Sequence, residues 1–225
     1  MKNNNSSFMY KEIKEQPAVL KKLIGKHIDK KKMAVVFKEF AHHQDEIRKI
    51  GRITLLGCGT SYHAAMLGNY LLEELSGLPC EFELAEEFTA RKIVVEKKTA
   101  VIILSQSGET ADALTAAYKA KGKGALVIAI TNKHGSTLEK TADLALNIGA
   151  GEEKSVAATK TFTAELMTVV LLALFFRQKR KSQSIRTKKI LSEISGISVK
   201  IGRVINMEKK IAVIAKEYVN TRQMI

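Results

Sequence analysis

The chain has 225 residues, a formal net charge of +14 and a hydrophobic content of 45%, which allows one large soluble domain with shorter extensions. Two cysteines are too few for a disulfide framework. The longest apolar run, residues 166–176, is shorter than the roughly 20 residues of a membrane span, and the first residues are too polar for a signal peptide. We therefore expect a cytoplasmic protein with no membrane partner.

The spacing of apolar residues predicts helices first, then alternating strands and helices, then helices again. Residues 8–50 are expected to hold two helices, one around Ala18–Ile24 with Pro17 near a turn, and one from Val35 to about Lys49. Five short runs are typical of strands, over residues 52–56, 80–85, 99–104, 125–130 and 143–147. Helical patterns separate them, over residues 64–75, 86–88, 110–121 and 137–142. The rest of the chain is expected to be helical, beginning with a buried apolar helix.

Strands that alternate with helices at this spacing predict an α/β fold with a doubly wound, parallel, five-stranded sheet and right-handed crossovers. We expect three regions: a helical lead-in over residues 1–48, the sheet domain over residues 49–182, and a C-terminal helical extension over residues 183–225. Ligands bind such sheets beyond the carboxyl ends of the strands, so the loops that follow the strands are the candidate sites.

Two of these loops are rich in glycine and hydroxyl residues, namely Gly57–Ser61 and Ser105–Thr110. A strand that turns through glycine into a helix N-terminus presents free N–H groups and the positive end of the helix dipole. Hydroxyl groups add donors without charge. Two such loops predict a phosphorylated small molecule held from two sides, by the hydroxyls of Thr60, Ser61, Ser105, Ser107 and Thr110. In the alternative interpretation, Ser107 only caps its helix, with Glu109 favourable in the first turn.

A third stretch, Gly151–Lys160, places small residues, hydroxyls and a lysine ahead of the apolar helix. In one interpretation Thr159 caps that helix. In the other, the backbone of this stretch and Lys160 close one side of a ligand pocket. The sequence leaves both interpretations open.

Other reactive residues give weaker signals. His42 and His43 are adjacent, so their side chains diverge on a helix and lack metal-ligand spacing. Gly57–Gly59 lacks the third glycine of a dinucleotide fingerprint. His63 could face a ligand, although a surface or packing role is simpler. Cys58, at a helix start, could have a lowered pKa, although a small buried residue is again the simpler interpretation. We expect no metal and no cofactor.

The positive charge is concentrated in three runs of lysine and arginine, at residues 30–32, 177–181 and 186–189. Such runs attract nucleic acid or acidic surfaces, but no aromatic residues are interleaved with them to stack on bases. A solvated basic face is the simpler interpretation, and its field also favours an anionic substrate. Nucleic acid is therefore the weaker of the partner hypotheses.

Taken together, the motifs resemble a known family. Gly57–Tyr62, Ser105–Asp112 and Val156–Thr163 are similar to the motifs of the sugar isomerase (SIS) domain, and Tyr10–Pro17 resembles the segment that leads into it. Within the family, the chain is most similar to the first isomerase lobe of the glutamine–fructose-6-phosphate aminotransferases. The likeness covers nearly the whole chain and implies a flavodoxin-like SIS sheet.

The resemblance implies a sugar-phosphate site. The residues that match the phosphate ligands of the family are Ser105, Gln106, Ser107 and Thr110. The residues that match its sugar contacts, or complete the pocket, are Thr60, Ser61 and the backbone near Val156. The family usually has serine at the position of Ala158, so one polar contact to the sugar would be missing.

The resemblance also implies that the chain is incomplete for catalysis by itself. The family's glutaminase domain and its second SIS lobe, which carries the isomerase chemistry, have no counterpart in this sequence. No catalytic acid or base can be assigned, and the catalytic residues remain unknown.

Three hypotheses for the function follow. In the first, the chain binds a hexose 6-phosphate, fructose 6-phosphate or glucosamine 6-phosphate, in amino-sugar biosynthesis, and needs a partner for catalysis. In the second, it is a non-catalytic sugar-phosphate sensor that acts on a partner through its basic C-terminal helices. In the third, it is an independent isomerase with Glu152 or Glu153 as the base. In each case we expect a homodimer, or a complementary SIS lobe, over the apolar surface that a lone lobe exposes.

Overall fold

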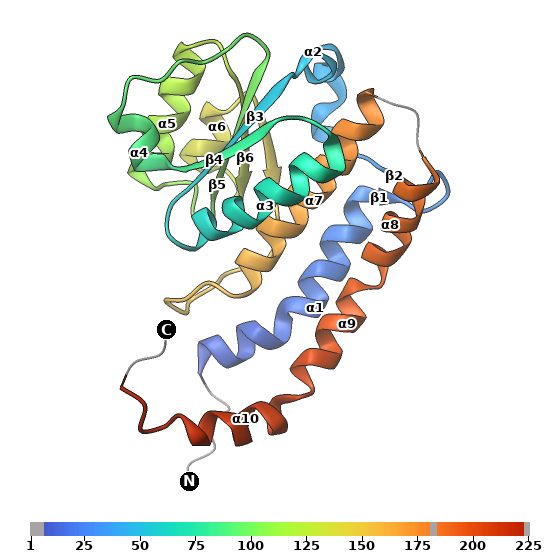
Figure 1. The fold of residues 1–225 in the computed structure, drawn as a ribbon, viewed down its shortest axis with the longest axis vertical. Helices are drawn as coiled ribbons and strands as arrows, with labels where there is room; N and C mark the ends of the chain where they lie inside the picture. Colours follow the sequence, from blue (N-terminus) through green and yellow to red (C-terminus); the bar gives the residue numbers. More distant parts are fainter. Residues whose placement is uncertain (1–6, 181–183, 223–225) are drawn as a thin grey trace.

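The computed structural model describes residues 7–180 and 184–222, and Figure 1 shows the fold. The expected boundary at residues 182–183 and the polar residues 1–6 lie outside the described residues. The helices are α1 (Phe8–His27), the 3-10 helix η1 (Lys38–His43), α2 (Gln44–Lys49), α3 (Thr60–Ser76), α4 (Ala85–Ala90), α5 (Ala111–Gly122), α6 (Thr137–Thr141), α7 (Lys160–Arg180), α8 (Ile185–Ser195), α9 (Ile197–Ile205) and α10 (Glu208–Glu217). The strands are β1 (Ile28–Asp29), β2 (Ala34–Val35), β3 (Arg52–Gly57), β4 (Cys80–Leu84), β5 (Thr99–Ser105), β6 (Leu126–Thr131) and β7 (Leu144–Asn147).

A five-stranded sheet forms the centre, in the order β4-β3-β5-β6-β7, and all its neighbouring strands are parallel. Numbered along the chain within this sheet, the order is 2-1-3-4-5, the flavodoxin-like order of doubly wound folds. Every residue of β5 is buried, as its continuous apolar run predicts for a central strand. The predicted fold class is confirmed.

Helices cover both faces of the sheet (Figure 1). Alternate residues of each strand point to opposite faces, so Val101 and Ile103 pack with α4, α5 and α6, whereas Ile102 and Leu104 pack with α1, α3 and α7. The second face is the thicker one, because α1 lies outside α7 and α9 packs on α1. The carboxyl ends of the strands remain free for loops.

Helix α7 is the most apolar element. Among the described residues it is the one helix that is long and apolar enough to cross a membrane by length and composition. However, 61% of its apolar window is buried inside the protein, and it packs along α3 and α1. The prediction of a buried helix over this run is confirmed.

The prediction that Pro17 lies near a turn is wrong. Helix α1 continues through it from Phe8 to His27. A proline inside a helix costs about 3 kcal/mol in a lost hydrogen bond and a steric clash. Packing of α1 against α7 and α9 outweighs this cost.

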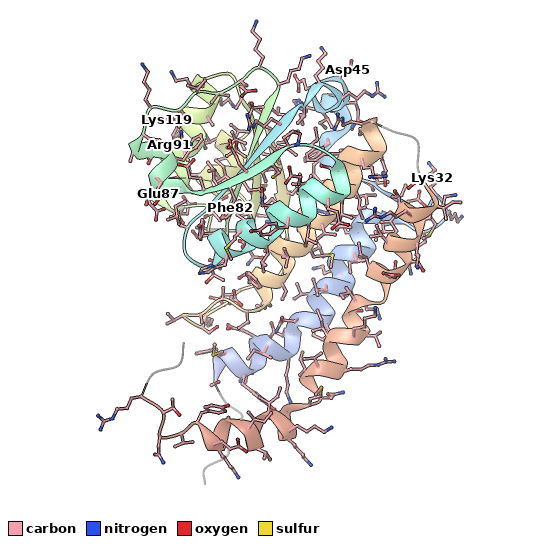
Figure 2. All side chains as sticks on the ribbon, viewed as in Figure 1. Lys32, Asp45, Phe82, Glu87, Arg91 and Lys119 are labelled. Carbon is pink, nitrogen blue, oxygen red and sulfur yellow. The ribbon has the colours of Figure 1, made fainter. Side chains whose placement is uncertain are left out.

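The prediction of a helix that begins at Val35 is also wrong. Val35 lies in β2, which pairs with β1 as a short antiparallel hairpin. Its backbone is held extended by Gln178 of α7, which accepts from Val35 N at 2.9 Å and donates to Val35 O at 3.1 Å. The basic run at residues 30–32 forms the exposed turn of this hairpin, and Lys32 points away from the protein in Figure 2. A tertiary contact therefore overrides the local helical pattern.

Candidate functional site

A cavity of about 200 Å³ lies at the carboxyl edge of the sheet, between the loops that follow β3 and β5. This is the point where the strand order reverses, at which doubly wound folds bind ligands. The loop after β7 closes its third side. All eight predicted site residues line this one cavity: Thr60, Ser61, Ser105, Gln106, Ser107, Thr110, Val156 and Ala158.

The loop after β5 is held rigid by its own hydroxyl groups. Ser105 Oγ accepts from the N–H of Gly108 at 3.1 Å and lies 3.3 Å from Thr110 Oγ1. Gly108 has a φ of +63°, a conformation that favours glycine, and a Cβ there would lie 2.3 Å from Ser136 Oγ. The loop backbone is also tied to the neighbouring β6 loop, because Gln106 O accepts from Asn132 N at 3.1 Å.

The alternative role for Ser107, as the cap of α5, does not fit the structure. Helix α5 begins at Ala111, so its N-cap residue is Thr110, whose side chain makes no capping hydrogen bond. Ser107 Oγ instead accepts from the N–H of Glu109 at 3.2 Å, within the loop. The N-terminus of α5 therefore opens toward the cavity without a cap from Thr110.

The loop after β3 is short because Gly57 has no side chain. A Cβ on Gly57 would lie 2.6 Å from the carbonyl carbon of Ser61 and 2.7 Å from Tyr62 N, both backbone atoms of α3. Glycine thus allows α3 to begin three residues after the strand ends. This close approach puts Thr60 and Ser61, the first two residues of α3, beside the cavity. His63, in contrast, is exposed and is not among the lining residues.

Two glutamates hold the loop after β7 in place. Glu12 of α1, which is 4% exposed, accepts from Ser155 Oγ, from Ser155 N and from Lys154 N at 2.5 Å. Burial raises the pKa of Glu12, but these hydrogen bonds outweigh it and lower the pKa below its usual value. Glu153 accepts from the N–H groups of Thr159 and Lys160 at 2.8 and 2.9 Å. The N-terminus of α7 is thus capped by Glu153.

This arrangement decides between the two interpretations of the 151–160 stretch. Its residues Glu153, Ser155, Val156 and Ala158 line the cavity, so the stretch does close one side. Lys160 does not take part: its side chain is buried, and its ammonium group pairs with Glu15 of α1 at 2.5 Å. Lys160 therefore fastens α7 to α1.

Glu165 of α7 lies beneath the cavity and was not predicted from the sequence. It is 1% exposed, and its Oε1 lies 2.9 Å from Ser61 Oγ. Burial raises its pKa to about 8; the hydrogen bond from Ser61 opposes this shift, and the charge of Glu153 adds to it. No local sequence signal marks this residue, because it is one acid in an apolar helix whose partner is 104 residues away.

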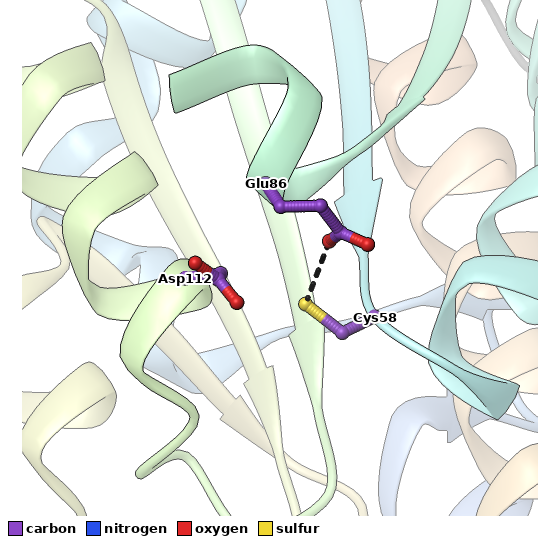
Figure 3. A group of neighbouring side chains, drawn as sticks. All are labelled: Cys58, Glu86 and Asp112. Carbon is purple, nitrogen blue, oxygen red and sulfur yellow. Dashed lines mark hydrogen bonds between the residues drawn. The ribbon is translucent and has the colours of Figure 1, made fainter. Parts of the chain in front are cut away.

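Cys58 lines the cavity and lies next to Glu86 and Asp112 (Figure 3). The thiol is 3.6 Å from Glu86 Oε2, and the three groups lie within 4.8 Å of one another. Burial raises the pKa of Cys58 to about 11, and the charge of Glu86 adds to this, so the thiol is protonated at neutral pH. Both acids are exposed and stand in the first turns of α4 and α5, where helix dipoles favour them without a metal.

The basic side chain of Lys119, in α5, has a structural role at the end of α4. Lys119 donates to the carbonyl oxygens of Thr89 and Arg91 at 2.8 and 2.6 Å and ties α5 to the end of α4. Figure 2 shows Lys119 and Arg91 side by side there, on the outer surface.

Comparison with known proteins gives consistent matches. The SIS domain family matches residues 46–175. The chain is 36% identical over 225 residues to glutamine–fructose-6-phosphate aminotransferase [isomerizing] 2 of Homo sapiens, covering 100% of this chain and 33% of that protein. It is also 36% identical to the aminotransferase of Caldanaerobacter subterraneus subsp. tengcongensis, covering 99% of this chain and 37% of that protein. The chain thus spans about one third of the length of the curated relatives it matches.

A comparison with solved structures agrees with these sequence matches. The C-terminal domain of glucosamine-fructose-6-phosphate aminotransferase from Francisella tularensis superposes with a TM-score of 0.89 at 28% identity, covering 98% of this chain and 61% of that chain. The similarity therefore extends over nearly all of this chain, its helical N- and C-terminal parts included.

Proposed function

Because the chain belongs to the SIS domain family, we propose that its cavity binds a hexose 6-phosphate such as fructose 6-phosphate or glucosamine 6-phosphate. The observation that supports this proposal most is the convergence of three separate loops on one cavity. Hydroxyl groups from two loops and the N-termini of α3 and α5 meet there. Helix N-termini with hydroxyl donors suit the charge and size of a phosphate group.

We assign the phosphate to the loop after β5, through Ser105, Gln106, Ser107 and Thr110. The sugar would then lie toward Thr60, Ser61 and the loop that carries Val156 and Ala158. The names of the relatives support a hexose 6-phosphate, since fructose 6-phosphate is in the name of both curated aminotransferases.

We propose binding without independent catalysis. Among the described residues that line the cavity, Glu153 is the one carboxylate. Its oxygens already accept from Thr159, Lys160 and Thr161, which leaves them poorly placed to abstract a proton from a sugar. Glu152 is exposed and pairs with Lys154 at 3.3 Å.

The hypothesis of a sugar-phosphate sensor stays a prediction. The cytoplasmic location also stays a prediction, which the two free cysteines favour.

Ser107→Ala is expected to weaken phosphate binding roughly 10- to 100-fold, because a hydrogen bond to a charged group contributes about 1.5–3 kcal/mol. Thermal unfolding with fructose 6-phosphate measures this. At 100 times the dissociation constant, the wild type should gain about 2.7 kcal/mol, or roughly 5–10 °C in Tm. Ser195→Ala is the matched control, because Ser195 Oγ bonds only within α8, to Leu191 O at 2.8 Å. No shift in the wild type at millimolar ligand would overturn the proposed function.

We further propose that a second copy of the chain covers an apolar groove between α1, α9 and α10. The groove has a volume of about 550 Å³, and its apolar walls include Ile13, Ile201, Val204 and Ile211. None of the described residues of α10 is buried, and an isolated helix of ten residues is marginal in water. A homodimer would stabilise α10 by burying this face.

Ile211→Lys is expected to convert that dimer into a monomer, since Ile211 is 53% exposed and lines the groove. Light scattering after size exclusion measures the change as a halved mass. Val94→Lys is the control, because Val94 is also an exposed apolar residue, at 87%, but lies outside the groove. A wild type that is monomeric at every concentration would contradict the dimer and favour a complementary lobe as partner.

A further inference from the structure

A buried carboxyl group forms part of the support of the cavity. Glu165 of α7 is 1% exposed, and the hydroxyl that lies 2.9 Å from it, that of Ser61, lines the cavity. Ser61 therefore stands between a titratable group inside the protein and any ligand in the cavity. The proposed function does not by itself use Glu165.

The contact between Glu165 and Ser61 is held fixed by the packing of α3 on α7. One turn further along α7, Val169 packs on Gly68 of α3, and a Cβ on Gly68 would lie 2.9 Å from Val169 Cγ1. Helices that approach this closely cannot slide apart without losing buried contacts. This packing holds Ser61 of α3 next to Glu165 of α7.

The charges around Glu165 favour its neutral form. The loop after β7 contributes Glu153, a like charge, and α3 contributes the uncharged Ser61. The nearest lysine along α7, Lys160, is paired with Glu15 of α1. The buried acid of α1, Glu12, is bonded to the backbone of the loop after β7. Burial is the main cause that raises the pKa of Glu165 to about 8, within the range in which proteins work.

We propose that Glu165 is a positioning residue that sets which way the Ser61 hydroxyl donates. In the structure Ser61 Oγ donates to Glu165 Oε1, which is the arrangement of the ionised acid. When Glu165 is neutral, its own O–H needs an acceptor, and Ser61 Oγ, its hydrogen-bond partner at 2.9 Å, can accept it, which leaves the Ser61 proton free to bond an oxygen of the ligand. When Glu165 loses its proton to solvent, Ser61 must donate to the carboxylate, and a negative charge stands beneath an anionic ligand. The neutral form is thus the binding-competent form. This inference rests on the proposed function.

The test is the affinity for fructose 6-phosphate at pH 7 and pH 9, measured by calorimetry. If only the neutral form binds, the wild-type protein should bind about tenfold more weakly at pH 9. The ligand itself does not change over this range, because the second pKa of its phosphate is near 6. Glu165→Gln keeps the size and hydrogen bonding of the neutral carboxyl group, so it should bind at pH 7 within about threefold of the wild type and show no loss at pH 9.

Proton uptake gives a second readout that needs no variant. At pH 8 the ligand should draw about half a proton onto Glu165 as it binds, seen as a dependence of the binding heat on the ionisation heat of the buffer. A wild-type affinity that is equal at pH 7 and 9, or a Glu165→Gln variant with the same tenfold loss, overturns the inference. Zero proton uptake at pH 8 also overturns it. Absence of wild-type binding at pH 7 overturns the proposed function instead.

Discussion

Gly57→Ala is expected to abolish detectable sugar-phosphate binding and to lower the free energy of unfolding by about 1–3 kcal/mol. The added Cβ would lie 2.6 Å from the carbonyl carbon of Ser61, an atom of the α3 backbone, which cannot rotate away as a side chain could. The first turn of α3 must move, and the hydroxyls of Thr60 and Ser61 move with it. Displacements of this kind disrupt several contacts to the ligand at once. Calorimetric titration and urea unfolding measure the two effects.

Gly51→Ala is the matched control for this variant. Gly51 precedes the amino end of the same strand, β3, is exposed, and has nothing within 4 Å of its Cβ position. Its N–H bond to Lys98 O, at 2.9 Å, does not involve a side chain. This substitution should leave both affinity and stability nearly unchanged. Normal ligand binding by Gly57→Ala would show that the start of α3 does not form part of the site.

Between pH 4 and pH 9, the free energy of unfolding of Glu165→Gln is expected to rise relative to that of the wild type by on the order of 4 kcal/mol. The pKa of Glu165 is about 8 in the folded protein and near 4.5 in the unfolded chain. Below pH 4.5 both states hold the proton, and its stabilising contribution is complete. As the pH rises through 8 that contribution is lost, since the unfolded chain ionises first. Glutamine does not ionise, so the stability of the variant does not fall with pH for this reason.

Urea unfolding of both proteins from pH 4 to 9 measures this difference. Glu12→Gln provides a control of opposite sign, because the pKa of Glu12 is lowered in the folded protein. Its stabilising contribution is present above pH 4.5 and is lost as the pH falls, so the variant should be less stable at pH 7. A stability difference between Glu165→Gln and the wild type that does not change with pH would refute the buried neutral carboxyl group.

The features of the site that follow from local sequence were predictable. A strand such as β5 is a continuous apolar run, and in a parallel sheet every strand ends at the edge where ligands bind. Once the strands are placed, the loops with Ser105 and Thr60 must meet. The resemblance to a family then supplied Gln106, Val156 and Ala158, whose residue types alone indicate no ligand.

The features that were missed depend on partners far apart in the sequence. Val35 is extended because of Gln178, 143 residues later, and Glu165 is informative only because α3 brings Ser61 to it. Lys160 has the residue type of an anion ligand, but its ammonium group forms a salt bridge with Glu15 of α1 instead. No local pattern contains these pairs. The division of the chain at residues 48 and 182 also stays a prediction.

The contact of Glu12 with the loop after β7 has a consequence for synthesis of the protein. Glu12 is made early, but its partner Lys154 follows 142 residues later. At about 5–20 residues per second, translation separates the two by roughly 7–30 s. During that interval the buried carboxylate and apolar side of α1 have no native partner, while β3 to β6 with their helices are already complete. The third wall of the cavity is therefore the last part of the site to assemble as the nascent chain leaves the ribosome.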